Sequence, residues 1–517
     1  MKTRGVNLFD NPKFWRNIIL NSNCRINGTR KLEGKAFTCV FFTKYCDVGC
    51  PFCFFRSDLA KPIPAIKGEF SEEGFEKFVT FANSANLGYL LISGGGEPFT
   101  RFDYIVETIR RVNVNRIVIV TSGNWALEYE KAKALVATLF EANNGRSHPA
   151  EIVIRLSLDE FHCKKLGYVH AINIIRIFEE YYSNSKKFSL KIHTMLNDKA
   201  VDNLMSYFPR SSKTSTIECG SDSTDVVKVE PYSYKVRFES GYQVQIGVAK
   251  IFYPNLKADL TNPNGVIRAM DVFDEDMKKS EDYNPSVLKN YDGTEGLDFW
   301  INYNGNVTTW GNQLLDNLHN IYVDDYAQIV DRTLLDPASL GTIDRGFQYR
   351  ENVISEVNPL AVLRSKVINI RDYAGAIMLE ESHTRLYYTL RVMQDYMKEG
   401  KLNDVEFLKL PREIRTCLCM TKEELISLYN ESNYSIFSEY TSKKFVLEEW
   451  RDLFELVQKG HYQVTDSQVQ DAINFYNGNC SDKIETIDSL HVQHDPNQYA
   501  RLIEKIIRMK AEVLERR

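Results

Sequence analysis

The stretch Phe37-Thr-Cys-Val-Phe-Phe-Thr43 is followed, after one lysine, by Tyr45-Cys-Asp-Val-Gly-Cys-Pro-Phe-Cys-Phe54. The first of these segments is a short apolar run, which predicts a buried β-strand. The second carries Cys46, Cys50 and Cys53 in a C-x3-C-x2-C spacing. Three thiolates this close together can hold three irons of a [4Fe–4S] cluster and leave the fourth iron without a protein ligand. An iron with an open coordination site can bind and activate a small molecule, so the loop after this strand indicates catalysis.

Downstream of the cysteine loop, strand-like and helix-like segments alternate. Helical patterns begin at Ser71, a suitable N-cap, and recur near Phe102–Val112, Glu128–Glu141 and Tyr168–Tyr182. Apolar strands separated by helices are typical of a parallel sheet with covered faces, and six such units predict a partial (β/α)6 barrel in an α/β fold. The six predicted strands are Phe37–Thr43, Tyr89–Ser93, Arg116–Thr121, Ile152–Leu158, Phe188–Met195 and Tyr242–Phe252.

The pattern changes after this core. Residues 211–294 are rich in polar residues, and Asp271–Asp282 is acidic, as in a solvated surface segment. Leu297–Trp310 contains Asn304-Gly305 between β-compatible flanks, which predicts a hairpin. Beyond about Val357 the chain is mostly helical in pattern, up to a packing helix at Tyr499–Arg517. We therefore expect an N-terminal extension (1–35), a barrel core (36–255), a small β-containing bridge (256–350) and a helical C-terminal domain (351–517).

Composition excludes several classes of protein. The 517 residues include 43% hydrophobic and 26% charged side chains, which is ordinary for a globular protein. The net charge of −5, without a basic block, gives no electrostatic signal for nucleic acid. No segment approaches the roughly 18 apolar residues of a membrane span, and the first residues lack the apolar core of a signal peptide. Ten cysteines, three of them clustered, favour metal ligands and buried thiols over disulfides, so we expect a soluble, cytoplasmic protein.

Small and polar residues follow the predicted strands at one end of the sheet. The second strand ends in Ser93-Gly-Gly-Gly-Glu-Pro98, the third in Thr121-Ser-Gly-Asn124, and the fourth in Arg155-Leu-Ser-Leu-Asp159. Barrels build their active sites at the C-terminal ends of parallel strands. Glycines there allow the backbone to approach a ligand closely. The cysteine loop, which follows the first strand, is expected at the same end.

With these motifs in place, the chain resembles the radical S-adenosylmethionine (radical SAM) enzyme superfamily. The three-cysteine motif of that family stands here as Cys46, Cys50 and Cys53, and its Gly-Gly-Glu motif stands as Gly95, Gly96 and Glu97, followed by a proline. The resemblance covers roughly Phe37–Phe252, under half of the chain. It implies one [4Fe–4S] cluster whose open iron binds S-adenosylmethionine. Reductive cleavage of that cofactor gives a 5′-deoxyadenosyl radical, which abstracts hydrogen from a substrate.

The resemblance also implies which residues meet the cofactor. Gly95, Gly96 and Glu97 would line its amino group. Phe52 would lie beside the adenine. The ribose and carboxylate would be met by Ser122, Arg155 and Ser157. The auxiliary cysteines that peptide-modifying members carry in a SPASM extension are missing after the hairpin, and no preceding segment is long enough for a cobalamin domain.

Several residues have more than one interpretation. A zinc site would need a second ligand pair, and Cys417-x-Cys419 has the wrong spacing. Asp159 and His162 could move a substrate proton, or Asp159 could cap a helix while His162 lies on the surface. Lys191 and His193 share one face of the fifth strand and could line the site. Cys219 could donate hydrogen to a product radical, or be a small buried residue.

Three functions remain open. The first is a radical enzyme acting on a small polar metabolite, such as a sugar or nucleoside, with flavodoxin or ferredoxin as electron donor. The second is a peptide-modifying maturase, whose helical domain would recognise a leader peptide. The third is an iron–sulfur sensor or scaffold without turnover. The residues that would select the substrate lie in loops and in the helical domain, which carry no recognisable code.

Overall fold

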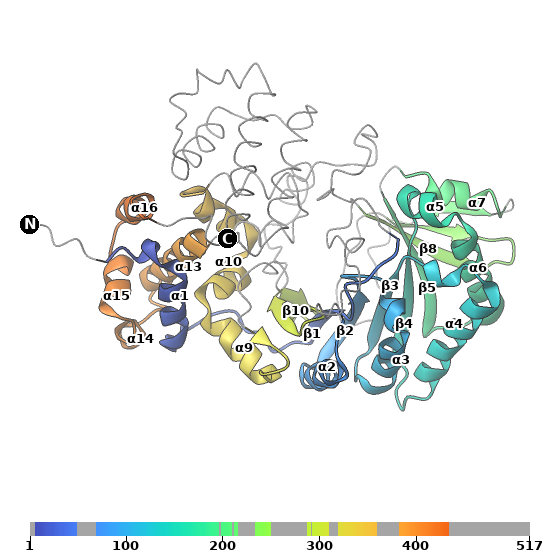
Figure 1. Ribbon diagram of the computed structural model, residues 1–517, viewed down its shortest axis with the longest axis horizontal. Coiled ribbons are helices and arrows are strands. Elements are labelled where there is room, and N and C mark those ends of the chain that lie inside the picture. Colours follow the sequence, from blue (N-terminus) through green and yellow to red (C-terminus); the bar gives the residue numbers. More distant parts are fainter. Residues whose placement is uncertain are drawn as a thin grey trace, which may run out of the picture.

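The structure, a computed structural model, describes residues 6–48, 69–195, 198–208, 211–215, 233–249, 287–290, 292–309, 319–358 and 382–433. In this part of the chain a large mixed sheet with helices on one face adjoins a cluster of helices (Figure 1). Cys50, Cys53, Phe52, Cys219 and the segments Asp271–Asp282 and Tyr499–Arg517 lie outside the described residues.

Six parallel strands form the middle of the sheet and follow one another in chain order. Consecutive strands are hydrogen-bonded neighbours in the order β1-β2-β3-β4-β5-β8. This is the order of a partial (β/α) barrel, so the predicted fold class is confirmed. The six strands are β1 (Ala36–Phe41), β2 (Leu87–Ser93), β3 (Arg116–Thr121), β4 (Glu151–Ser157), β5 (Phe188–Met195) and β8 (Gln243–Ala249).

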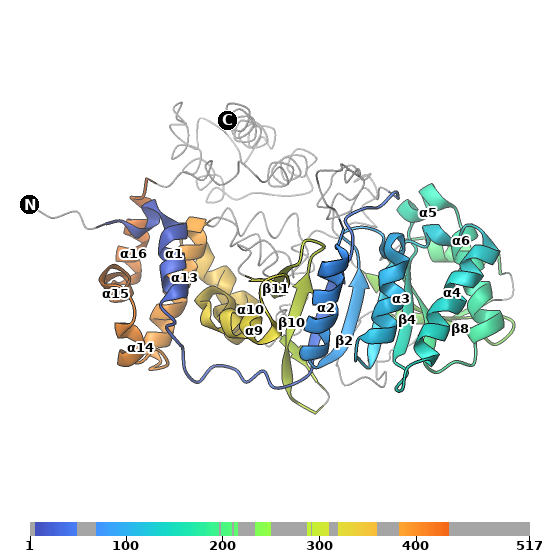
Figure 2. The same cartoon turned by 60° about the horizontal axis from the view of Figure 1, so that its bottom comes forward.

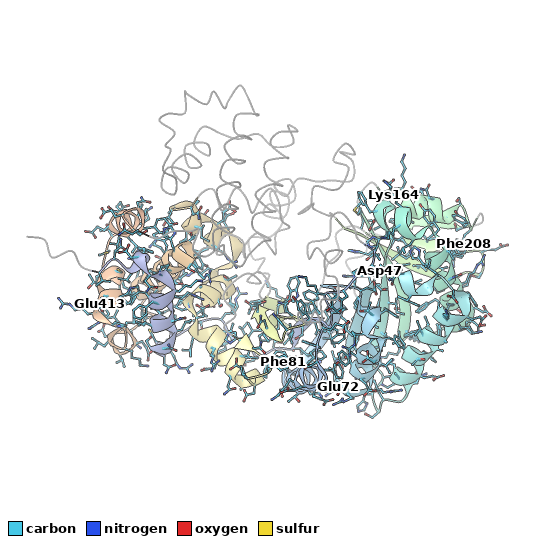
Figure 3. The ribbon with its side chains drawn as sticks, viewed as in Figure 1. Asp47, Glu72, Phe81, Lys164, Phe208 and Glu413 are labelled. Atoms are coloured by element: carbon cyan, nitrogen blue, oxygen red, sulfur yellow. The ribbon has the colours of Figure 1, made fainter. Side chains whose placement is uncertain are left out.

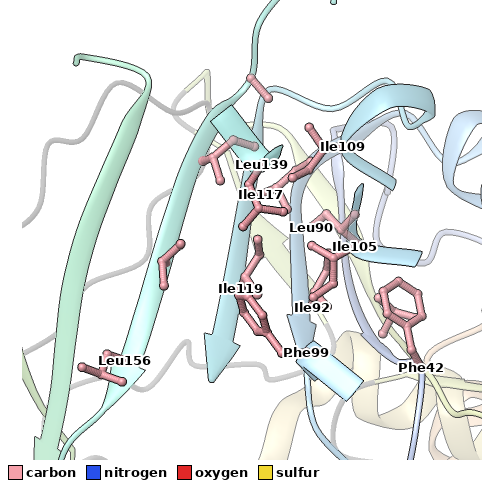
Figure 4. Packing of buried hydrophobic residues seen from close by; sticks show 14 of the residues in the cluster. Phe42, Leu90, Ile92, Phe99, Ile105, Ile109, Ile117, Ile119, Leu139 and Leu156 are labelled. Carbon is pink, nitrogen blue, oxygen red and sulfur yellow. The ribbon is translucent and has the colours of Figure 1, made fainter. Parts of the chain in front are cut away.

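Helices between the strands cover one face of the sheet (Figure 2). Ser71 is the N-cap of the first of them, as predicted, and its Oγ accepts a hydrogen bond from the Gly74 N–H at 3.0 Å. Alternate strand residues such as Leu90 and Ile117 pack against Ile105 and Ile109 in the core on this face (Figure 4). The covering helices are α2 (Glu72–Ser84), α3 (Phe102–Arg111), α4 (Tyr129–Asn144), α5 (Glu160–Leu166), α6 (Val169–Ile177), which a π-helical turn extends to Tyr182, and α7 (Ala200–Met205).

Both edges of the parallel region are extended by further strands. Beyond β8 lie the antiparallel strands β7 (Ser233–Arg237) and β6 (Ser212–Ser215), which the sequence pattern did not indicate. At the other edge, the predicted hairpin is present as β10 (Glu295–Ile301) and β11 (Asn306–Thr309), with Gly305 at φ 81° in the turn. Instead of standing apart, β10 pairs in parallel with β1. The short strands β9 (Val287–Lys289) and β12 (His319–Asn320) complete this edge.

The helical cluster contains residues from both ends of the described chain. Helix α1 (Pro12–Asn21) packs among helices that are distant in the sequence (Figure 1). Its Trp15 and Ile19 share a core with Leu386 and Leu390. The other helices are α9 (Tyr326–Leu335), α10 (Pro337–Ser355), α13 (Ser382–Lys398), α14 (Asp404–Leu408), α15 (Arg412–Leu418) and α16 (Lys422–Asn430). The first helix after the sheet is α9, which begins at Tyr326 within the predicted bridge.

A buried ion pair joins α1 to the start of α10. The Arg16 guanidinium donates to both carboxylate oxygens of Asp336, at 2.9 and 2.8 Å, and to Thr389 Oγ1 at 3.2 Å. Asp336 also caps α10 by accepting from the Ala338 and Ser339 N–H groups. Burial alone would raise the pKa of Asp336, but the charge of Arg16 and these hydrogen bonds outweigh it, and the pKa lies below its ordinary value.

Among the helices in the described ranges, none is both long enough and apolar enough to cross a bilayer.

Candidate active site

The cysteine loop leaves the end of β1 and is held by its neighbours. Thr43 Oγ1 accepts a hydrogen bond from the Tyr45 N–H at 3.0 Å, and Asp47 Oδ1 accepts one from Asn124 Nδ2 at 2.6 Å. Asp47 lies at the same end of the sheet as Lys164 of α5 (Figure 3). Cys46 is partly buried in this loop. The first of the predicted cluster ligands is therefore at the C-terminal end of the strands, as expected.

The glycine run after β2 packs directly against the cysteine loop. A Cβ atom added to Gly95 would lie 2.9 Å from Thr43 O, and one added to Gly96 would lie 2.0 Å from Tyr45 O. The next residue, Glu97, donates its backbone N–H to Tyr45 O at 2.8 Å. Only glycine tolerates this backbone approach. The glycines predicted to line a ligand thus also have a structural task, which is to let the two loops touch.

The Glu97 side chain ties the loop after β2 to the end of β3. Its Oε1 accepts from Thr121 Oγ1 at 2.7 Å and from the Phe99 N–H at 3.2 Å. Its Oε2 accepts from the Ser122 N–H at 2.8 Å and Ser122 Oγ at 2.6 Å. Burial raises the pKa of Glu97, and the hydrogen bonds from Ser122, Thr121 and Phe99 oppose that rise. The carboxylate and Ser122, both predicted to meet the cofactor, are bonded to each other.

Thr121 extends this network into the loop after β3. Its Oγ1 accepts from the Gly123 N–H at 3.0 Å and from Trp125 Nε1 at 2.9 Å while donating to Glu97. Gly123 has a φ of 78°, which favours glycine. The loops after β1, β2 and β3 therefore form one hydrogen-bonded unit.

Arg155 and Ser157 lie two residues apart on β4 and so share a face of the sheet, the one opposite α2–α6. Both are partly exposed. The Arg155 Nε is buried and has no hydrogen-bond partner. On the neighbouring strand β5, Lys191 pairs in register with Arg155, and His193 pairs with Ser157. The structure thus places the predicted cofactor contacts Arg155 and Ser157 beside Lys191 and His193, which the sequence indicated as separate candidates.

Asp159 caps helix α5 and also binds His162. Asp159 Oδ1 accepts from the Phe161 and His162 N–H groups at 3.0 and 2.9 Å, and Oδ2 contacts His162 Nδ1 at 2.6 Å. The exposed fractions are 2% for Asp159 and 7% for His162. The capping interpretation of Asp159 is therefore correct, but His162 is not a surface residue. Burial would raise the pKa of Asp159, yet the charge and hydrogen bonds of His162 lower it below its ordinary value.

Two further titratable residues lie near this pair and were missed in the sequence. Asp198 follows β5, and burial raises its pKa to about 6 although it accepts from the Glu160 and Ala200 N–H groups. His170 of α6 is fully buried, and burial together with the charge of His162 lowers its pKa to about 4. A Cβ on Gly123 would lie 2.9 Å from His170 Cδ2. Asp198 could have been predicted as a site residue, because it follows a parallel strand. His170 lies on a helix, and nothing in its local sequence indicated a site.

The donor set of the cysteine loop fits an iron–sulfur cluster. Within the described ranges, no group of three or more His, Cys, Asp or Glu side chains could hold a metal ion, and of the predicted ligands only Cys46 is in those ranges. Three thiols in a C-x3-C-x2-C spacing supply the ligands that such clusters take. The loop that carries the first thiol is anchored by the backbone of Glu97 and the side chain of Asn124.

Comparisons with known proteins give a weak result. No family model and no curated protein matches the chain. Similar solved structures include a histidine-tagged anSMEcpe with bound AdoMet, at 13% identity and a TM-score of 0.35, covering 78% of this chain and 100% of that chain. Native anSMEcpe with bound AdoMet has 14% identity and a TM-score of 0.36, over 72% and 99%. The same protein with AdoMet and a Kp18Cys peptide has 12% identity and a TM-score of 0.36, over 72% and 99%. TM-scores this low carry no argument about the activity of this chain.

Proposed function

We propose that this chain is a radical S-adenosylmethionine enzyme. The observation that supports the proposal is the close contact of two motifs at the ends of adjacent parallel strands. The Gly95-Gly96-Glu97 run packs against the backbone of Thr43–Tyr45, immediately before Cys46. A zinc site would not require the glycine run beside the cysteine loop, and an ordinary turn would not require the cysteines. The contact between the two motifs therefore favours a ligand that both of them bind.

Cys46, Cys50 and Cys53 would hold one [4Fe–4S] cluster. When bound, the cluster would supply the electron that cleaves S-adenosylmethionine reductively, and the resulting 5′-deoxyadenosyl radical would take hydrogen from the substrate. The polypeptide would position the cofactor through the backbone of Gly95 and Gly96. Because the Glu97 carboxylate and Ser122 hold two loops together, we assign them mainly to fixing the shape of this site. Phe52, Arg155 and Ser157 remain proposed cofactor contacts.

Asp159 and His162 are proposed to handle a substrate proton. The Asp159 carboxylate fixes the orientation of the imidazole through Nδ1, so the proton would be exchanged at Nε2 of His162. Both side chains follow β4 at the end of the sheet where the cysteine loop lies. The substrate would be a small polar metabolite, such as a sugar or a nucleoside, and the electron would come from a flavodoxin-like or ferredoxin-like donor.

The decisive experiment is reductive cleavage of S-adenosylmethionine. The full chain would be reconstituted anaerobically with iron and sulfide, supplied with dithionite, and assayed for 5′-deoxyadenosine. We expect Cys46→Ala, Cys50→Ala and Cys53→Ala each to abolish cleavage, and Cys419→Ala, an exposed cysteine of the helical cluster, to leave it unchanged. Cleavage that survives Cys46→Ala would rule the proposal out. A chain that binds iron and cofactor but makes no 5′-deoxyadenosine would instead be a sensor or scaffold.

A further inference from the structure

The stretch of chain that carries the three predicted cluster ligands leaves the sheet and returns to it at one place. Thr43, just after β1, and Glu69, just before α2, form an isolated antiparallel bridge. Beside this bridge the Phe70 N–H donates to Phe42 O at 2.9 Å. Cys46, Cys50 and Cys53 all lie between the two bridged residues in the sequence. We call Thr43, Glu69 and Phe70 the neck of the cysteine loop.

The hydroxyl of Thr43 ties the two sides of the neck together. Its Oγ1 accepts from the Tyr45 N–H at 3.0 Å on the outgoing side and donates to Glu69 Oε1 at 3.4 Å on the returning side. The Thr43 side chain is buried. A hydroxyl can accept and donate at the same time, whereas a valine of similar shape can do neither. The polar atom of Thr43, and not its bulk alone, therefore connects the two sides.

Arg101 holds the returning side of the neck. Its Nη1 donates to Phe70 O at 3.1 Å and to Glu69 Oε2 at 3.5 Å. Its Nε and Nη2 donate to the two carboxylate oxygens of Asp103 at 3.2 and 2.9 Å, and its guanidinium carbon lies 3.5 Å from the centre of the Tyr104 ring. The guanidinium is a planar fork with fixed donor directions. Because Asp103 and Tyr104 orient that fork, Nη1 is directed at the neck.

One short segment thus contacts the chain on both sides of the predicted cluster ligands. The Glu97 N–H donates to Tyr45 O at 2.8 Å, on the side where the chain leaves β1. Glu97 is followed directly by a 3-10 turn, Pro98–Arg101, whose last residue reaches Phe70 on the side where the chain returns. The Gly-Gly-Glu motif and Arg101 therefore belong to one structural unit that fixes where the cysteine loop begins and ends.

We propose that Thr43 and Arg101 are positioning residues, which hold the two ends of the cysteine loop together so that its three thiolates can bind one cluster. The cluster in this inference rests on the proposed function. Bringing three thiolates of one stretch of chain to a single cluster costs conformational entropy, and this cost is smaller when both ends of the stretch are already held. Loss of a contact at the neck should therefore weaken the hold on iron, although neither residue is a ligand.

The test measures how fast iron leaves the cluster, so it needs no turnover. The full chain would be reconstituted anaerobically with iron and sulfide, and release of iron to the chelator bathophenanthroline would be followed by absorbance. We expect Arg101→Met and Thr43→Val each to lose iron about tenfold faster than wild type, which corresponds to the loss of one charge-assisted hydrogen bond. Arg111→Met is the matched control. It breaks the exposed Arg111–Glu76 pair at 2.6 Å, at the other end of α3, and should change the rate less than about twofold.

Two comparisons separate positioning from general stability. Thr43→Ser keeps the hydroxyl and should lose iron at the wild-type rate; equally fast loss in Thr43→Ser and Thr43→Val would overturn the inference. The urea midpoint of each chain without its cluster reports the stability of the fold. If the rates for Arg101→Met and Arg111→Met simply follow these midpoints, Arg101 acts through general stability and the inference is overturned.

The remaining outcomes also have a definite meaning. Equal rates of iron loss in wild type, Arg101→Met and Thr43→Val would overturn the inference and leave the proposed function intact. A wild-type cluster that is retained normally but yields no 5′-deoxyadenosine in the separate cleavage assay would contradict the proposed function and leave the inference intact. A wild-type chain that takes up no iron would contradict both.

Discussion

At the scale of single residues, Glu97 shows how one carboxylate can organise a site. It accepts four hydrogen bonds, three of them from Thr121 and Ser122 at the end of the neighbouring strand. The motif that contains Glu97 was recognisable from local sequence, because its glycines and its acid are adjacent. Its partners were not, because nothing local indicates which hydroxyl a buried carboxylate will meet after folding. The same holds for His162, whose burial depends on how α5 packs.

His170 should make the stability of the protein depend on pH. The pKa of this buried histidine is lowered to about 4, whereas in the unfolded chain it takes up a proton near its ordinary value. As the pH falls from 7 to 5, the unfolded state binds the proton and the folded state does not, so folding loses about 2 kcal/mol. The free energy of unfolding of wild type minus that of His170→Leu, from urea denaturation, should fall by this amount. A difference that stays constant between pH 7 and 5 for His170→Leu would contradict the assignment.

At the scale of elements, the parallel strands were predictable and the added edge strands were not. Strands β1–β3 are mostly apolar, and β4, β5 and β8 carry apolar residues on at least one face, so their burial can be predicted from local sequence. Strands β6 and β7 are short, their sequences carry serine, lysine and few apolar residues, and they lie at one edge of the sheet. The hairpin was found from its Asn304-Gly305 turn. Its pairing with β1 was not, because a contact between residues so far apart in sequence has no local signal.

Gly96 should be essential for seating the cysteine loop. In Gly96→Ala the new Cβ would lie 2.0 Å from Tyr45 O and 2.5 Å from Tyr45 N, so the two loops must separate. Overpacking of this kind costs about 1–3 kcal/mol. We expect a lower midpoint of urea unfolding and reduced iron and sulfide content after anaerobic reconstitution. Gly145→Ala is the matched control, since its Cβ would lie 3.5 Å from Glu141 O, and normal iron content in Gly96→Ala would contradict the loop contact.

At the scale of the whole molecule, the helical cluster depends on residues that precede the sheet. Leu8, Phe9, Trp15 and Ile19 complete a core made mostly by α10, α13 and α15. The sequence indicated a helical region and a separate N-terminal extension, but not that the two are one packed unit. The domain boundaries themselves stay a prediction.

Arg16 should contribute strongly to stability because its removal leaves Asp336 buried without a counter-charge. We expect Arg16→Met to lower the free energy of unfolding by about 3–5 kcal/mol. Arg25→Met, which breaks the exposed Arg25–Asp331 pair at 2.8 Å, should cost no more than about 1 kcal/mol. Urea unfolding followed by circular dichroism would compare the two, and Asp336→Asn in the Arg16→Met background should recover part of the loss. Equal costs for both arginine variants would show that the buried pair is not needed.

The place of α1 also bears on how the chain folds during synthesis. Arg16 meets Asp336 and Thr389 across 320 and 373 residues of sequence. While the ribosome makes the strands from Ala36 to Ala249, the apolar side chains of α1 have no helical partners to pack against. Contacts this distant slow folding and leave apolar surface open to aggregation. Helix α1 is therefore made before the helices that it packs against and docks late, so its apolar side chains would benefit from protection by a chaperone in the meantime.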